Sequence, residues 1–358
     1  MRILFDGNLN PSPKSGIERY FTMLAKNLPT STSLATSNRS HTGVLRIGPH
    51  CVDQPPLPAF RPRRLSGFLN ALAWSAHQFD LVHWMNYGPS QFASHLLRNG
   101  TPLVLTVHDL IHEIRGAPPD LLDRTARQRN YDRANAILCV SDYTRKDLLE
   151  HYDIDRNKLH VVYHGSSLEV PSIIPKDLEN CPPYFLHVGP RSGYKNFSPL
   201  LPVIKKVLGQ KPDIQFRLVG PSIDQALMTS LRDLGIEAAV VEEKRVDDIR
   251  LAALYFNSIG LLHPSLHEGF GIPLLEAMSC ATVPIALNCT SIPEVLGESG
   301  ILVQQEEFHE GFEHAMLKLI ENPSYRNELV KCCLERANLF SWNRAAKETL
   351  TAYVKAMG

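Results

Sequence analysis

A glycine-rich run near position 270 combines the residue types that an anion site needs. It reads HEGFGIPLLEA over residues 267–277 and follows an apolar stretch predicted to be a strand. The glycines let the main chain approach a ligand closely, and Pro273 suits the first position of a helix. Such a turn points N–H groups and the positive end of a helix dipole at a ligand. We expect an anion site flanked by Glu268 in the loop and Glu276 in the first helical turn; the plainer alternative is a turn with two surface glutamates.

Two cations follow another predicted strand. Arg191 and Lys195 lie in VGPRSGYKN, residues 188–196. Carboxyl ends of parallel strands face the ligand crevice in doubly wound sheets, so this pair is placed to neutralise a diphosphate. Where a phosphate group departs during a reaction, negative charge builds on it, and preorganised cations lower that barrier. Surface ion pairing is the alternative for either residue.

Two residues of the first half have the same kind of placement. Gly16 follows the first predicted strand and opens a helix, so its main chain can approach the same phosphates. His108 ends a predicted strand and is expected to point to the crevice. An ordinary helix start capped by Ser15, and a structural role for His108, are the alternatives. Three other histidines are interpreted as structural: His83, His164 and His187.

The run around position 270 resembles a motif of retaining GT-B glycosyltransferases of family 4. Glu268 and Glu276, with seven residues between them in EGFGIPLLEA, resemble the E-x7-E motif of that family. The resemblance implies that Glu276 binds the ribose hydroxyls of the nucleotide and that Glu268 lies beside the transferred sugar. It also implies that main-chain N–H groups of Phe270 and Gly271 meet sugar hydroxyls, and that His108 contacts sugar and acceptor.

The resemblance extends over most of the chain, through SGIERY (15–20), TVHDL (106–110), CVSDYTRKDL (139–148) and VGPRSGYKN (188–196). It implies an α/β fold of GT-B architecture, with two doubly wound Rossmann-like domains facing a cleft and a C-terminal helix crossing back to the N-terminal domain. The segment VVEEKRVDD (240–248) departs from the family, which has a Gly-containing loop beside the base there. The choice between uracil and guanine therefore stays open.

Short apolar runs alternate with amphipathic stretches, which predicts parallel strands covered on both faces by helices. A stretch with four prolines, residues 166–183, interrupts this rhythm and is interpreted as an interdomain linker. We expect an acceptor-side domain at 1–170, a donor-binding domain at 171–340 and a crossover helix at 341–358. The expected strands are 3–5, 81–84, 103–107, 136–140, 159–163, 184–188, 216–219, 238–241, 259–263 and 283–287, with helices at 17–28, from Asn196 and from Ser341, the last with apolar positions Ala346, Leu350, Tyr353 and Val354.

Composition excludes several classes of protein. The 358 residues contain 37 basic and 37 acidic side chains, and this balance argues against a nucleic-acid binder. No apolar run approaches the ~20 residues of a spanning helix, and the start, MRILFDG, reads as a strand rather than a signal peptide. The seven cysteines are scattered without a C-x-x-C pair, which favours a reducing cytoplasm.

No metal and no other cofactor is expected. Asp153 and Asp155 have the D-x-D spacing of metal-dependent glycosyltransferases, but they lie in HYDIDRNKL, where a polar turn is expected. The stretch 29–62 has no recognised motif and is read as a loop or a short strand pair. The basic residues at its end are read as a solvated loop or as contact with a phosphorylated or membrane-surface partner: Arg61, Arg63 and Arg64.

The expected function is metal-independent transfer of a hexosyl group, mannose or another hexose, from a UDP- or GDP-hexose with retention of configuration. The acceptor would be a glycan or lipid-linked hydroxyl, in cell-surface polysaccharide or glycolipid synthesis, in the cytoplasm or peripherally at the inner membrane face. The alternatives are a nucleotide-sugar epimerase, a phosphorylase and a non-catalytic nucleotide-sugar-binding protein. An epimerase needs acid–base groups on both sides of the sugar, and no such set is evident.

Overall fold

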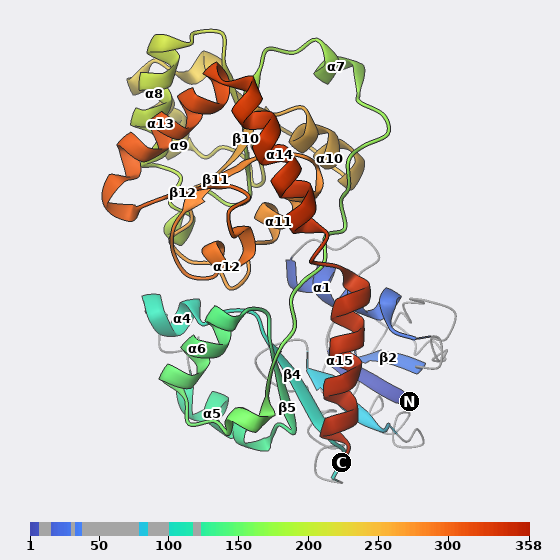
Figure 1. Cartoon of the computed structure of the whole chain (residues 1–358). Helices are drawn as coiled ribbons and strands as arrows, with labels where there is room; N and C mark the ends of the chain where they lie inside the picture. Colours follow the sequence, from blue (N-terminus) through green and yellow to red (C-terminus); the bar gives the residue numbers. More distant parts are fainter. Residues whose placement is uncertain (7–15, 30–32, 38–78, 85–99, 117–122) are drawn as a thin grey trace, which may run out of the picture. The chain divides into compact units, whose positions relative to one another are not determined.

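The computed structural model describes residues 1–6, 16–29, 33–37, 79–84, 100–116 and 123–358. The chain divides into two compact units, which are drawn with the sequence colours in Figure 1. Unit 1 comprises Met1–Gly165 together with Trp342–Gly358, and unit 2 comprises Ser166–Ser341. The chain therefore passes from unit 1 into unit 2 and returns.

Unit 1 contains a six-stranded sheet in the order β2-β1-β3-β4-β5-β6, and every pairing in it is parallel. Its strands are β1 (Arg2–Asp6), β2 (Ser33–Ser37), β3 (Leu81–Trp84), β4 (Leu103–Val107), β5 (Ala136–Cys139) and β6 (Leu159–Val161). Its helices are α1 (Gly16–Asn27), α4 (Ile111–Arg115), α5 (Arg124–Arg133), α6 (Asp142–His151), the short 3-10 helix η1 (Arg156–Lys158) and α15 (Trp342–Ala356).

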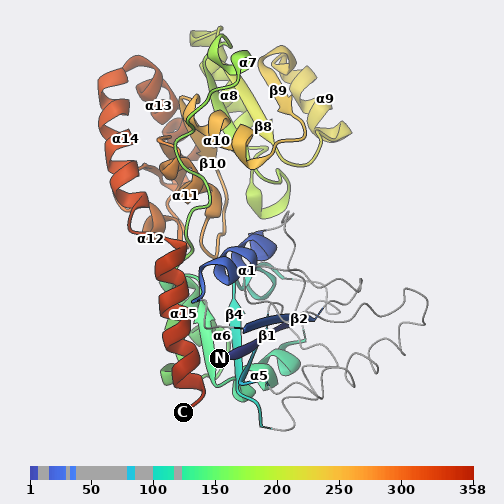
Figure 2. The same ribbon diagram turned by 90° about the vertical axis from the view of Figure 1, so that its right-hand side faces the viewer.

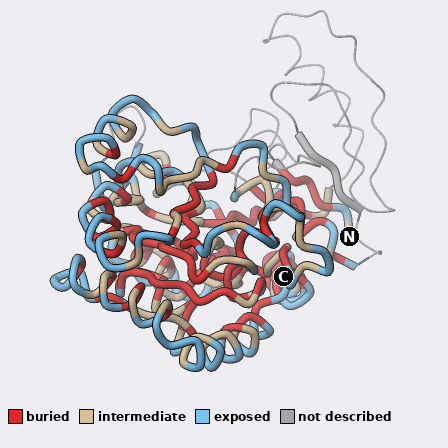
Figure 3. The backbone as a smooth tube through the Cα atoms, turned by 90° about the horizontal axis from the view of Figure 1, so that it is seen from above, coloured by how far each residue is buried: buried red, intermediate tan, exposed pale blue. Residues whose placement is uncertain are grey.

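Alternate residues of the unit 1 strands enter two separate cores, because successive side chains of a strand point to opposite faces of the sheet. Ile3 and Phe5 join buried residues of α1 and α15 on one face. Leu4 joins Tyr131 of α5 and Leu148 of α6 on the other face. In Figure 3, buried stretches of the chain lie in the interior and exposed stretches lie around them. Both faces of the sheet are thus covered, as the alternating pattern predicts.

The C-terminal helix α15 packs on unit 1, which confirms the predicted crossing of this helix. Its buried side includes Trp342, Ala346 and Tyr353, which share a core with α1 and with strands of the sheet. Both Figure 1 and Figure 2 show α15 lying along the elements of unit 1. Val354 is 58% exposed, so the apolar position predicted there faces solvent instead.

Unit 2 contains a second parallel six-stranded sheet, in the order β12-β11-β10-β7-β8-β9. Its strands are β7 (Tyr184–Val188), β8 (Gln215–Val219), β9 (Val240–Glu243), β10 (Gly260–His263), β11 (Pro284–Leu287) and β12 (Ile301–Val303). Its helices are α7 (Lys176–Glu179), η2 (Gly193–Lys195), α8 (Leu200–Gln210), α9 (Gln225–Leu234), η3 (Glu237–Ala239), α10 (Asp248–Phe256), α11 (Ile272–Ser279), α12 (Ile292–Leu296), η4 (Gln305–Glu307), α13 (Phe308–Glu321) and α14 (Pro323–Ala337). The strand order reverses between β7 and β10, where ligands bind in such sheets.

Several element boundaries differ from the sequence-based expectation. Helix α8 begins at Leu200 rather than Asn196, because the 3-10 turn η2 and the left-handed Asn196 (φ 54°) come first. Strand β9 begins at Val240 rather than Ala238, since η3 precedes it. The linker contains the short helix α7. Strand β2 lies in the stretch 29–62, which was left open between a loop and a short strand pair, and β12 was not predicted.

Two remaining expectations concern the surface and the membrane. Ser15, the basic residues 61, 63 and 64, and most of the stretch 29–62 lie outside the described residues. None of the helices that the structure describes is long and apolar enough to span a bilayer.

Candidate active site

The loops that follow β7 and β10 lie together at the carboxyl edge of the unit 2 sheet, at the point where the strand order reverses. The N–H of Leu266 donates to the carbonyl of Tyr194 at 2.8 Å, which joins the two loops directly. The side-chain amide of Asn196 donates to the carbonyl of Pro264 at 3.2 Å. The glycine-rich run and the basic pair therefore form one site, although Glu268 and Lys195 are 73 positions apart in the sequence.

Lys195 and Glu268 form an ion pair at the centre of this site. Lys195 Nζ lies 2.6 Å from Glu268 Oε1, and His263 Nε2 lies 3.0 Å from the same oxygen. Burial by itself raises the pKa of Glu268, but Lys195 and His263 outweigh it and lower the pKa to about 2. Glu268 is therefore a carboxylate throughout the neutral range. It is suited to stabilise positive charge or to accept hydrogen bonds, rather than to donate a proton.

Arg191 lies in the same loop, and only one of its two terminal guanidinium nitrogens has a hydrogen-bond partner among the described residues. One nitrogen, Nη2, donates to the carbonyl of Pro221. The other, Nη1, is buried and has no hydrogen-bond partner among the residues that the structure describes. Burial lowers the pKa of Arg191 from its ordinary value, although the group remains a cation at neutral pH. A buried, unpartnered N–H of a cation is a strong donor for a phosphate oxygen.

Glu276 lies on α11, on the side that contacts α10. It is buried, and the hydroxyl of Tyr255 on α10 donates to its Oε2 at 3.2 Å. Glu276 is the fifth residue of α11, in the second turn rather than the first, because the helix already begins at Ile272. Pro273 is accordingly the second helical residue.

The turn before α11 has the backbone that its glycine predicts. Gly271 is the N-cap of α11 with φ 93°, and a Cβ there would meet Leu274 Cδ1 at 2.8 Å. The ring of Phe270 is buried and packs edge-on against Phe340, with ring centroids 5.8 Å apart. Packing of the side chain fixes the main chain of this turn next to Glu268.

His108 and Gly16 belong to unit 1. Gly16 is the exposed first residue of α1. His108 follows the last residue of β4, and its ring meets that of Tyr20 edge-on with centroids 5.1 Å apart. Burial lowers the pKa of His108 to about 4, so the imidazole is neutral at pH 7. Its Nε2 is buried without a hydrogen-bond partner in the described part of the chain.

The other sequence-predicted histidines have structural contacts. His83 bridges Tyr353 Oη at 2.6 Å and Thr106 Oγ1 at 2.8 Å. His164 is buried against Tyr20 and Trp342, and His187 is buried with Nδ1 3.0 Å from the carbonyl of Leu262.

Asp153 and Asp155 have the structure expected of a polar turn. Asp155 caps η1 by accepting from the N–H of Asn157 at 2.9 Å, and the Asp153 N–H donates to the side chain of Gln128. Within the ranges that the structure describes, no three His, Cys, Asp or Glu side chains group as a metal site.

Four residues that shape the site were not predicted from the sequence. His263 and Tyr255 contact the two glutamates directly. Thr290 and Ser291, after β11, hydrogen bond to the main chain of Glu268. His263 ends a predicted strand immediately before the glycine-rich run, so its position in the sequence could have identified it as a site residue. Nothing in the sequence marked the other three.

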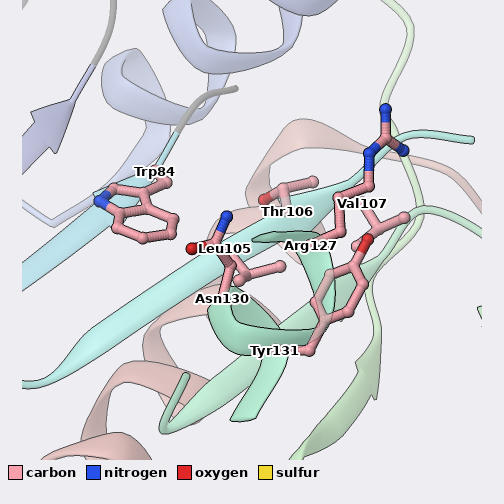
Figure 4. A pocket seen from close by; sticks show the side chains of 7 residues that line it. All are labelled: Trp84, Leu105, Thr106, Val107, Arg127, Asn130 and Tyr131. Carbon is pink, nitrogen blue, oxygen red and sulfur yellow. The ribbon is translucent and has the colours of Figure 1, made fainter. Parts of the chain in front are cut away.

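Unit 1 contains a pocket that none of the sequence-predicted site residues lines. Trp84 lies on one side of it, with Arg127 and Tyr131 on the other (Figure 4). Arg127 pairs with the buried carboxylate of Glu113. The pocket is near the carboxyl ends of β3 and β4, and its full lining is Trp84, Leu105, Thr106, Val107, Arg127, Asn130 and Tyr131.

Comparison with known proteins decides what kind of protein has this site. Two family models match, "Glycosyltransferase Family 4" over residues 14–170 and "Glycosyl transferases group 1" over residues 172–332. The chain is a GT-B glycosyltransferase of the family 4 type. HepE of Anabaena, solved with UDP and glucose, has the same fold, with a TM-score of 0.72 at 18% identity over 98% of this chain and 99% of that chain. Sucrose-phosphate synthase of Thermosynechococcus elongatus gives a TM-score of 0.74 at 19% identity over 99% and 98%.

Two curated relatives of this glycosyltransferase carry named activities. The O-antigen chain mannosyltransferase B of Escherichia coli is 24% identical, with 99% of both chains covered. The D-inositol 3-phosphate glycosyltransferase of a Nocardioides strain is 26% identical, over 78% of this chain and 68% of that protein.

Proposed function

We propose that this glycosyltransferase moves a hexosyl group, mannose in the first instance, from a nucleoside diphosphate sugar to an acceptor hydroxyl with retention of anomeric configuration. The acceptor is a glycan or a lipid-linked saccharide of a cell-surface polysaccharide or glycolipid. The mannosyltransferase that covers 99% of both chains supports mannose. The choice between GDP and UDP is left to experiment, because the segment at 240–248 departs from the family pattern.

The observation that carries this proposal is the arrangement of charges after β7 and β10. Two cations, Arg191 and Lys195, lie in one loop, and Glu268 pairs with Lys195 at 2.6 Å. The cations would hold the diphosphate, and Arg191 Nη1 has no partner among the described residues that would have to be displaced first. The negative charge that builds on the departing phosphate would then be stabilised by donors already in position. Preorganised donors of this kind lower the barrier to transfer.

The chemistry follows from the state of each group. The bond between the anomeric carbon and the phosphate oxygen breaks, and its electron pair leaves with the diphosphate. The acceptor oxygen bonds to the same face of the sugar, and the proton of the acceptor hydroxyl passes to the departing phosphate oxygen. Glu268, ionised with a pKa of about 2, stabilises the positive charge that builds on the ring. Glu276 binds the ribose hydroxyls, and the N–H groups of Phe270 and Gly271 meet sugar hydroxyls. Gly16 approaches the phosphates, and neutral His108 contacts sugar and acceptor.

We place the reaction in the cytoplasm, with peripheral contact at the inner membrane face when the acceptor is lipid-linked. The six cysteines that the structure describes form no disulfide with one another, which supports a reducing compartment. We propose that no metal takes part, because the two cations supply the positive charge that a metal provides elsewhere.

A donor screen tests the proposal. Purified protein is incubated with GDP-mannose, GDP-glucose, UDP-glucose, UDP-galactose and UDP-N-acetylglucosamine, with and without EDTA, and release of nucleoside diphosphate is measured. We expect turnover of one GDP- or UDP-hexose that EDTA does not abolish. NMR of the product made with a soluble saccharide acceptor then reports the anomeric configuration. Conversion of a nucleotide sugar to its epimer without nucleotide release would identify an epimerase, and binding without any conversion would identify a non-catalytic binder.

A further inference from the structure

Two consecutive hydroxyl residues after β11 bracket the main chain of Glu268. The N–H of Glu268 donates to Thr290 Oγ1 at 3.1 Å. The hydroxyl of Ser291 donates to the carbonyl oxygen of Glu268 at 2.9 Å. Both polar groups of one residue's main chain are therefore held by side chains from a single short segment.

Thr290 adopts a backbone conformation that is unfavourable for its type. Its φ is 53°, in the left-handed region, which β-branched residues rarely occupy. A glycine or asparagine would adopt this conformation at lower cost. Such strain persists where surrounding structure imposes it, and it concentrates at functional sites. The feature that Thr290 provides and glycine lacks is the hydroxyl that accepts from Glu268.

Ser291 is diverted from the role that its position predicts. It is the N-cap of α12, where a serine side chain ordinarily accepts from an N–H of the first helical turn. Ser291 makes no such cap, and its fully buried hydroxyl donates to Glu268 instead. Ser291 thus lacks the capping hydrogen bond within α12 and instead makes a hydrogen bond to the loop that contains Glu268.

The hydrogen bonds of Thr290 and Ser291 are not needed merely to anchor the loop before Glu268, because that loop has other connections. Cys289 Sγ already contacts the carbonyl of Ser265 at 3.4 Å, and Leu266 is joined to Tyr194 from the other side. The loop before Glu268 is therefore anchored without Thr290 and Ser291. The two hydroxyls act at Glu268 itself, whose carboxylate is fixed at its far end by Lys195 and His263.

We propose that Thr290 and Ser291 are positioning residues for transfer: they fix the peptide groups on both sides of Glu268 and so aim its carboxylate at the sugar. This inference rests on the proposed function and names a further requirement of the same site. Displacement of a catalytic group by about 1 Å lowers a rate by as much as about 10²-fold. Loss of either hydroxyl should accordingly reduce kcat without weakening nucleotide binding.

The informative substitution is Thr290→Gly, because it relieves the backbone strain while removing the hydroxyl. We expect its melting temperature to stay within about 3 °C of wild type, since glycine tolerates φ 53°. Its kcat should fall by about tenfold to 10²-fold, with the Kd for the nucleoside diphosphate unchanged within about twofold. Thr290→Ser keeps the hydroxyl and should recover most of kcat. Ser291→Ala should lower kcat in the same way.

Amide hydrogen exchange gives a readout that does not depend on turnover. The Glu268 amide should lose protection by at least about tenfold in Thr290→Gly and keep it in Thr290→Ser. The matched control is Asn322→Ala, which removes the side-chain cap of α14 and destabilises unit 2 away from the site. It should leave kcat unchanged, and any loss of protection at Glu268 should match the loss across unit 2 as a whole.

The outcomes separate this inference from the proposed function. Wild-type kcat in Thr290→Gly, or unchanged protection of the Glu268 amide, overturns the inference while wild-type turnover upholds the proposed function. A weakened Kd with unchanged kcat also overturns it, by placing the two hydroxyls in nucleotide binding. If the wild-type protein turns over no nucleotide sugar, the proposed function fails and takes this inference with it.

Discussion

At the residue scale, the Lys195–Glu268 pair determines what each partner can do. The side chains are only 17% and 10% exposed, so solvent screens the pair weakly. Lys195 keeps Glu268 ionised, and Glu268 holds the ammonium in place before any donor arrives. Arg191 lacks such an anionic partner at hydrogen-bonding distance among the described residues. A diphosphate would thus find one cation already oriented and a second with a free donor.

Removal of either cation should therefore reduce catalysis strongly. We expect Arg191→Ala and Lys195→Ala each to lower kcat/KM by about 10²-fold or more, through loss of about 3 kcal/mol of charge stabilisation. Steady-state kinetics with the donor found in the screen measures this. Lys206→Ala, which removes an exposed cation on α8, is the control and should behave as wild type. Complete loss of wild-type activity in EDTA, with recovery in Mn²⁺, would contradict the assignment.

The two glutamates should affect different kinetic constants. Glu276→Ala should raise the donor KM, because a ribose contact is made equally in the ground state and the transition state. Glu268→Gln should mainly lower kcat, because charge on the sugar ring appears only in the transition state. Tyr255→Phe removes the hydroxyl that donates to Glu276 and should raise KM by a smaller factor than Glu276→Ala. An unchanged KM in Glu276→Ala, or an unchanged kcat in Glu268→Gln, argues against this division.

At the element scale, α15 completes the core of unit 1. Its buried residues share a cluster with α1 and with β1, β3, β4 and β5. Tyr353 of α15 also makes a 2.6 Å hydrogen bond to His83 on β3, within the apolar core. A buried polar bond of this kind fixes one register of the helix, since any shift leaves both groups unsatisfied.

Neighbouring residues of α15 offer a matched pair for testing this. Tyr353→Ala should lower the free energy of unfolding of unit 1 by about 3–5 kcal/mol, because it creates a cavity and breaks the bond to His83. Val354→Ala, at an exposed position, should change it by less than about 0.5 kcal/mol. Urea unfolding gives the free energies, and hydrogen exchange assigns the loss to peptides of residues 1–165. Truncation after Leu339 should remove exchange protection from the same peptides; unchanged protection would show that α15 is dispensable for the unit.

The elements were more predictable than their contacts. Ten of the strands were predicted from apolar runs bounded by turn residues. A strand that is buried on both faces of its sheet has a continuous apolar sequence, which is easy to recognise. Strand β12 is only three residues long, and β2 lies in a stretch without a clear pattern. The Lys195–Glu268 contact joins residues 73 positions apart, and it depends on β7 being the neighbour of β10. Alternation of strands and helices does not fix that order.

Single-residue geometry was the least predictable level. Thr290 is left-handed although its residue type disfavours that conformation, so propensity points the wrong way. Ser291 begins a helix without capping it, again against its preference. Local rules fail at these two residues because contacts with Glu268, 22 and 23 positions away, override them. Such failures are expected where a site imposes its own geometry.

At the scale of the whole molecule, buried neutral histidines couple folding to pH. Burial lowers the pKa of His83 to about 3 and those of His108 and His187 to about 4, and it lowers the pKa of His164 well below its ordinary value. An unfolded chain titrates its histidines near pH 6.5. Between about pH 6.5 and pH 4 the unfolded state therefore binds protons that the folded state excludes. Asp147 acts in the opposite direction, because its pKa is raised to about 6 and the folded state therefore binds its proton more readily than the unfolded state does. The four histidines outnumber this single carboxyl group.

Because the unfolded state binds more protons than the folded state in this window, the free energy of unfolding falls as the pH drops from 6.5 toward 4. Above pH 6.5 the histidines are neutral in both states, and their contribution to stability has its full value. Each histidine contributes up to about 1.4 kcal/mol per pH unit in that window. We expect the free energy of unfolding, measured in urea at pH 7.5, 6.5 and 5.5, to fall most steeply over the last interval. His187→Gln should make this fall shallower by about one proton, whereas Leu24→Ala should lower stability equally at every pH. Parallel curves for His187→Gln and wild type would mean that the folded protein admits the proton at His187, and that its burial does not keep the imidazole neutral.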